Sequence, residues 1–169
     1  RKAQGLKVAD VNMHMIFTGN PGTGKTTIAR ILAKYLKAIG ALRGGQLVEV
    51  TRADLVGRYV GHTAPLTNQV IQSALGGVLF IDEAYSLYRG GEDSFGLEAI
   101  DTLVKGIEDH RDDLVVILAG YSKEMALFLT ANSGLASRFP NQIEFPDYTG
   151  AELLAITQSI AKSKGYRLD

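Results

Sequence analysis

The stretch "FTGNPGTGKTTIAR" (residues 17–30) decides the fold of this chain. Residues 19–26 within it have the pattern Gly-x-x-x-x-Gly-Lys-Thr, which follows a short apolar run and opens a segment with helical spacing. A strand, a glycine-rich loop and a helix in that order bind phosphate groups, because the loop N–H groups surround the anion and the helix directs its positive end at it. We therefore predict a phosphate-binding loop, with a plain glycine-rich turn as the alternative.

Individual residues of this loop indicate which ligands it binds. The lysine of such a loop reaches the β- and γ-phosphates of a nucleotide, and the following Ser or Thr hydroxyl binds Mg²⁺. We assign these roles to Lys25 and Thr26, and we predict ATP and Mg²⁺ as the cofactors. The predicted nucleotide-binding residues are Gly19, Asn20, Pro21, Gly22, Thr23, Gly24, Lys25, Thr26 and Thr27.

Beyond the loop, five short apolar runs alternate with helical patterns. The runs "VLFI" and "LVVILA" are continuous, as expected of strands buried on both faces of a parallel sheet. We predict an α/β fold of the P-loop NTPase type, with an open, mainly parallel five-stranded sheet and helices on both faces. The expected strands lie in residues 13–19, 46–50, 76–84, 113–121 and 141–147.

The segments between these runs predict helices with one apolar face. Helices are expected in residues 25–40, 66–75 and 96–110, and the first should bury a stripe made of Ile28, Ile31, Leu32, Tyr35 and Leu36. Near the end of the chain, Thr149 followed by Glu152 has the spacing of a capping box, which marks a helix start. We divide the chain into a nucleotide-binding αβ subdomain, residues 1–148, and the start of a helical lid subdomain, residues 149–169, with most of the lid missing.

Two adjacent carboxylates, Asp82 and Glu83, end the buried run "GVLFIDEA". Ligands of open α/β sheets bind at the carboxyl ends of the strands, so Asp82 is placed to hold Mg²⁺. Glu83 is then placed to act as the general base that activates a water for attack on the γ-phosphate. A charged turn without catalytic function is the alternative.

The composition excludes several other classes of function. The chain has no cysteine, which rules out disulfides and thiolate metal sites and fits a cytoplasmic location. Its three histidines are far apart in sequence, which disfavours a histidine zinc site. The formal net charge is zero, so nucleic acid is a disfavoured partner, and the apolar runs are too short to cross a bilayer.

With these motifs in place, the sequence resembles the AAA+ ATPases over nearly its whole length. The stretches "FTGNPGTGKTTIAR", "ADLVGRYVGHTA", "GGVLFIDEAYSL", "DDLVVILAGYS" and "LASRFPNQIEFPDY" resemble one branch of that superfamily. This branch includes stage V sporulation protein K, the red-type Rubisco activase CbbX (also called CfxQ) and the ATPase of type VII secretion. The likeness to the sporulation protein is carried by "DEAYSL", "RGGE", "FGLEAIDTLVKGIED" and "AGYSKEM".

The resemblance implies roles for residues that the motifs alone do not explain. Arg138 in "GLASRF" lies where such proteins place an arginine finger that acts on a neighbour's ATP, with Arg111 as a rival and a surface arginine as the alternative. Most AAA+ proteins carry a polar sensor at the end of the fourth strand, where this chain has "LAGYS". We assign the sensor to Tyr121 among Gly120, Tyr121 and Ser122.

The resemblance also implies a pore loop that contacts a protein client. In ring-shaped AAA+ proteins an aromatic–aliphatic–glycine step lines the central pore, and Tyr59, Val60 and Gly61 match it here. The flanking glycines would make the loop mobile, and an aromatic ring grips many sequences. The alternative is that Tyr59 packs into a small core beneath the loop. The glycine-rich stretch 87–96 is a second candidate pore loop.

Together these features predict an ATP-hydrolysing enzyme that assembles with itself into a ring, a hexamer in the full-length protein, and remodels or threads a protein client. The branch favours a sporulation-related role, with Rubisco activation or type VII secretion as alternatives. Two functions of other classes stay open: an ATP-dependent binding switch with little hydrolysis, and a clamp-loader-like module acting on DNA.

Overall fold

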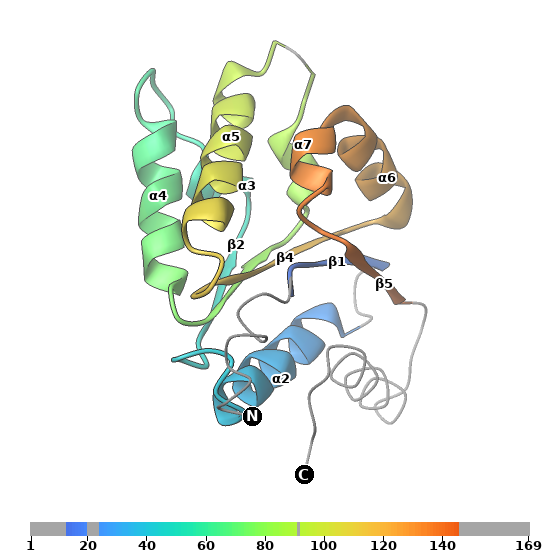
Figure 1. The fold of residues 1–169 in the computed structure, drawn as a ribbon. Helices are drawn as coiled ribbons and strands as arrows, with labels where there is room; N and C mark the ends of the chain where they lie inside the picture. The colour runs from blue at the N-terminus through green and yellow to red at the C-terminus, as the bar shows by residue number, and fades with distance from the viewer. Residues whose placement is uncertain (1–12, 20–23, 91, 146–169) are drawn as a thin grey trace.

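A parallel five-stranded sheet forms the centre of the chain, with one described helix on one face and a group of helices on the other (Figure 1). The computed structural model describes residues 13–19, 24–90 and 92–145. The strands lie in the order β2-β3-β4-β1-β5, and all four neighbouring pairs are parallel. They are β1 (Met15–Gly19), β2 (Leu47–Val50), β3 (Val78–Ile81), β4 (Val115–Gly120) and β5 (Asn141–Phe145).

All five predicted strands are present, and the two continuous apolar runs are the most buried. Every residue of β3 and β4 is buried, as expected for inner strands covered on both faces. The edge strands β2 and β5 carry partly exposed residues. The run at 76–84 was predicted too long, because β3 ends at Ile81 and a short 3-10 helix, η2 (Ala84–Leu87), follows the acidic pair.

Alternate side chains of the strands enter two separate cores. On one face, Phe17, Phe80 and Ile117 pack against α2 (Lys25–Ala38). On the other face, Ile16, Leu79 and Val116 pack beneath the remaining helices, which lie together above the sheet in Figure 1. These helices are α3 (Arg52–Leu55), α4 (Thr63–Ala74), α5 (Ser94–Asp109), α6 (Ser122–Ala131) and α7 (Ser133–Ala136).

The helix predictions need three corrections. Ile31 of the predicted stripe is 37% exposed, because Ala29 and Ala33 rather than Ile31 complete the buried face of α2. The helix α4 begins at Thr63, earlier than predicted. The helix α5 begins at Ser94, where the Asp93 side chain caps it, so the second candidate pore loop is shorter than 87–96. The predicted lid, residues 149–169, lies outside the described residues.

Candidate functional site

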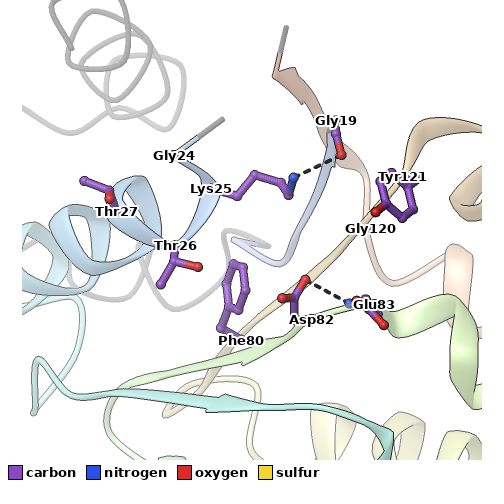
Figure 2. A pocket seen from close by; sticks show the side chains of 10 residues that line it. All are labelled: Gly19, Gly24, Lys25, Thr26, Thr27, Phe80, Asp82, Glu83, Gly120 and Tyr121. Carbon is purple, nitrogen blue, oxygen red and sulfur yellow. Dashed lines mark hydrogen bonds between the residues drawn. The ribbon is translucent and has the colours of Figure 1, made fainter. Parts of the chain in front are cut away.

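A cavity of about 320 Å³ lies at the carboxyl ends of β1, β3 and β4 (Figure 2). Three elements supply its side chains: the first turn of α2, the end of β3 and the end of β4. Because the three strands are neighbours and parallel, segments far apart in the sequence meet at this edge of the sheet. The lining residues are Gly19, Gly24, Lys25, Thr26, Thr27, Phe80, Asp82, Glu83, Gly120 and Tyr121.

Lys25 and Thr26 stand at the start of α2, where the N–H groups of the first helical turn and the helix dipole favour an anion. The Lys25 ammonium donates to the carbonyl of Gly19, at 3.0 Å. Partial burial lowers the pKa of Lys25, and the negative charge of Asp82 opposes this shift. Residues 20–23 of the predicted phosphate loop lie outside the described residues.

The acidic pair follows β3 in an unusual backbone conformation. Glu83 has φ 49° and ψ 48°, and among the described residues it is the only non-glycine with positive φ. Such a conformation costs about 1–3 kcal/mol and persists where the surroundings enforce it, often at functional sites. Here the Glu83 N–H donates to the Asp82 carboxylate at 2.9 Å, and the turn leaves the Glu83 side chain exposed at the cavity. The backbone thus separates the two carboxylates while both reach the cavity.

The end of β4 explains why this chain lacks a polar sensor at Gly120. A Cβ atom at that position would lie 2.8 Å from the ring of Tyr85 and 2.9 Å from the sulfur of Met125, so any larger residue would force these side chains to shift. Tyr121, the residue assigned as sensor, lines the cavity and its ring centre lies 6.2 Å from that of Tyr85. The predictions did not include Tyr85, although its position three residues after Asp82 in "DEAYSL" places it beside the site.

The donors at the cavity fit one metal ion in particular. Mg²⁺ takes oxygen ligands and is usually held by one or two protein groups together with phosphate oxygens and water. Thr26 offers a hydroxyl and Asp82 a carboxylate at the same cavity. Within the described residues, no group of three or more His, Cys, Asp or Glu side chains is arranged to hold a metal ion. The site therefore fits Mg²⁺ bound with a nucleotide better than a metal held by protein alone.

Arg138 lies at the other end of the sheet. It precedes β5, whose first residue Asn141 pairs with Met15 at the start of β1, whereas the cavity is at the end of β1. Its guanidinium forms an ion pair with Glu108 of α5 and donates to the carbonyl of Gly134 at 2.7 Å. The contact with Glu108 could not be predicted from the sequence, because it joins residues 30 positions apart. Arg138 is thus not a group of this chain's own cavity.

The predicted pore step is on the surface. Tyr59 is 64% exposed and Val60 is 87% exposed, so the alternative that Tyr59 packs into a small core is wrong. The ring of Tyr59 makes an edge contact with His62, with 5.4 Å between ring centres. Gly57 is buried, and a Cβ atom there would lie 2.5 Å from the Cβ of His62. Gly57 therefore allows the backbone to pack closely at this point, instead of making the loop mobile as predicted.

This geometry defines a P-loop NTPase of the α/β type, and comparisons with known proteins agree. The family model "ATPase family associated with various cellular activities (AAA)" matches residues 15–147. The chain belongs to this AAA family. No helix within the described residues combines the length and apolar character needed to span a bilayer.

The similar proteins include members of the branch that the sequence resembles. It is 55% identical to stage V sporulation protein K of Bacillus subtilis, over 99% of this chain and 52% of that protein. It is 52% identical to the chloroplastic ribulose bisphosphate carboxylase/oxygenase activase of Cyanidioschyzon merolae, over 99% and 58% of the two chains. Protein CfxQ of Xanthobacter flavus is 52% identical, over 98% and 53%. The chain thus spans about half the length of these curated relatives, and the predicted resemblance is confirmed.

A solved structure supports the fold independently. The AAA domain of FIGL-1, crystallised in complex with ADP, superposes with a TM-score of 0.58 at 22% identity, over 94% of this chain and 50% of that one. At this identity the likeness concerns the fold alone.

Proposed function

We propose that this chain is the nucleotide-binding αβ subdomain, residues 1–148, of an AAA+ ATPase that hydrolyses ATP and uses the energy to remodel or thread a protein. Residues 149–169 are proposed to begin the helical lid. One observation carries this proposal: Lys25, Thr26, Asp82 and Glu83 come from two distant segments and meet in one cavity beside a helix N-terminus. ATP is the ligand that this set of groups serves best.

Each side chain at the cavity has a chemical role in this proposal. Lys25 binds the β- and γ-phosphates, and backbone N–H groups at the start of α2 contribute further donors to them. Thr26 and Asp82 are the residues that would hold Mg²⁺, which when bound neutralises charge on the phosphates. Glu83 accepts a proton from the attacking water, and its exposed carboxylate leaves room for that water. Tyr121 is the proposed sensor beside the phosphates.

Arg138 is proposed to complete the site of a neighbouring subunit. A guanidinium that meets the charge developing on the γ-phosphate increases phosphoryl-transfer rates by about 10³–10⁵-fold in other systems. Since Arg138 lies at the end of the sheet away from its own cavity, it can serve only a cavity that another copy presents to it. Many AAA proteins form rings, and we propose a hexameric ring for the full-length protein. An isolated chain is then expected to bind ATP and to hydrolyse it slowly, as the binding-switch alternative describes.

The exposed loop residues Tyr59, Val60 and Gly61 are proposed to line the pore of that ring and to contact the client. The 55% identity with the sporulation protein favours a sporulation-related role in the cytoplasm, with Rubisco activation or secretion as alternatives.

The test compares ATP binding and hydrolysis in two variants of the full-length protein. Glu83→Gln should bind ATP normally and lose about 10²–10⁴-fold in turnover, the usual contribution of a general base. Arg138→Ala should also bind normally, and small amounts of it should inhibit mixed rings with the unaltered protein, because each variant subunit leaves a neighbour's site incomplete. Unchanged hydrolysis in Glu83→Gln would contradict the ATPase assignment. Inhibition confined to the variant's own subunit would contradict the role of Arg138.

A further inference from the structure

A partly buried ion pair joins three segments on the face of the sheet that α3, α4 and α5 cover. Arg52, the first residue of α3, donates two hydrogen bonds to the Asp93 carboxylate, at 2.7 and 3.0 Å. The same guanidinium donates to the carbonyl of Ser86 in η2, at 2.8 Å. Both side chains are mostly removed from solvent, at 17% and 13% exposed. Hydrogen bonds from Arg52 lower the pKa of Asp93 and so favour the charged form of this carboxylate.

Hydrogen bonds through Ser86 connect this ion pair to Glu83 at the cavity. The carbonyl of Glu83 accepts two hydrogen bonds from Ser86, from its N–H at 2.9 Å and from its hydroxyl at 2.7 Å. The carbonyl of Ser86 in turn accepts from Arg52. A change in the strained backbone of Glu83 would therefore move the acceptor that Arg52 binds.

The helix α3, which begins at Arg52, also leads directly into the loop that carries Tyr59. The helix α3 ends at Leu55, and the N–H of Gly57 then donates to the buried hydroxyl of Thr63 at 2.9 Å, which closes the loop at its base. The exit of the loop is bound to α5 as well, since the N–H of Ala64 donates to the Glu98 carboxylate at 3.0 Å. Both ends of the loop are thus fixed to segments that Arg52 and Asp93 connect.

We propose that Arg52 is a positioning residue that couples the state of the nucleotide cavity to the loop Gly57–His62. The inference rests on the proposed ATP-binding function and adds the residue that transmits it. Arginine suits this role because its planar fork binds both carboxylate oxygens and still offers a donor to the Ser86 carbonyl, which the single ammonium of lysine does not match.

A fluorescent reporter tests the coupling directly. The 169-residue chain contains no tryptophan, so Tyr59→Trp places one fluorophore on the loop. Addition of Mg²⁺ and the non-hydrolysable analogue AMP-PNP should shift its emission, while calorimetry measures binding independently. Adding Arg52→Gln should leave AMP-PNP binding in place and abolish the emission shift. Arg52→Lys, which keeps the positive charge, should also lose most of the shift.

The matched control is Arg43→Gln. Arg43 also forms a two-pronged ion pair with an aspartate, Asp113, but this pair lies near the amino ends of the strands, away from the cavity. Its loss should leave the emission shift intact, and circular dichroism should show native helix content in all variants.

Two results would overturn the coupling. Either the Arg52 variants keep the full emission shift, or the reporter chain binds AMP-PNP without any shift. A failure of the proposed function would give a different result from a failure of the coupling. If calorimetry detects no AMP-PNP binding to the reporter chain, the proposed function itself is wrong, and the inference about Arg52 is wrong with it.

Discussion

The strand Val78–Ile81 and the loop Gly57–His62 both carry large apolar side chains, but they place them in opposite environments. All four residues of the strand are fully buried between the two cores. In the loop, Tyr59 and Val60 point largely into solvent, although Gly57 at its base is buried. Both segments lie between the end of β2 and the acidic pair, and the helix α4 separates them in sequence.

The difference in burial means that the apolar side chains of the strand stabilise the fold, whereas those of the loop do so very little. Burial of an aliphatic side chain contributes about 1.5–3 kcal/mol to folding, which explains why β3 is apolar throughout. The exposed pair in the loop gains little from folding, so its apolar surface is available to contact another molecule. Substitutions in the two segments should therefore have opposite consequences for stability and activity.

The largest effect on stability is expected for Leu79→Ala in the strand. Leu79 is fully buried and lies between Val48 and Val116 in the sheet. Truncation should cost about 2–5 kcal/mol, because it removes buried methyl groups and leaves a cavity. Urea unfolding measures this loss, and ATP turnover per folded molecule should be unchanged. A loss below about 1 kcal/mol would show that this part of the core is loosely packed.

A smaller effect is expected for Gly57→Ala at the base of the loop. The new Cβ atom would lie 2.5 Å from the Cβ of His62 and 2.9 Å from its backbone carbon, so the turn must shift. Overpacking of this kind costs about 1–3 kcal/mol. Thermal unfolding measures it, with Gly134→Ala as the control, because a Cβ atom there meets nothing within 4 Å. Equal melting temperatures for the two variants would contradict the close packing at Gly57.

The smallest effect on stability is expected for Tyr59→Ala. Since Tyr59 is 64% exposed, the free energy of unfolding should change by no more than about 0.5 kcal/mol. In the proposed ring of the full-length protein, however, stimulation of ATP hydrolysis by fluorescein-labelled casein, an unfolded polypeptide, should be lost. A large drop in stability, or unchanged stimulation, would remove the proposed contrast between the strand and the loop.

Much of the fold and part of the site could be predicted from the sequence, because their signals are local. Continuous apolar runs indicate buried strands, and the spacing in residues 19–26 determines where the helix after β1 begins. Asp82 and Glu83 were found because they directly follow such a run.

The rest depends on contacts between distant segments. The exposure of Ile31 follows from which face of α2 meets the sheet, and the need for Gly120 follows from the ring of Tyr85, 35 positions earlier by residue number. Arg52 and Asp93 are 41 residues apart, and no periodicity relates them. The positive φ of Glu83 likewise arises from the turn between β3 and η2 and not from any preference of glutamate.

The position of Arg138 also restricts the symmetry of any assembly that uses it. In a two-fold dimer both partners present the same surface, so a single patch would have to contain both the cavity and Arg138, which lie at opposite ends of the sheet. If Arg138 of one copy is to reach the nucleotide of the next, unlike surfaces must meet, and every copy must be related to its neighbour by the same rotation. Among assemblies built from contacts between unlike surfaces, a closed ring leaves no cavity without an arginine, whereas an open chain of subunits leaves one at its end. If Arg138 serves a neighbouring site as proposed, its place at the far end of the sheet favours a closed ring of head-to-tail contacts over a two-fold dimer.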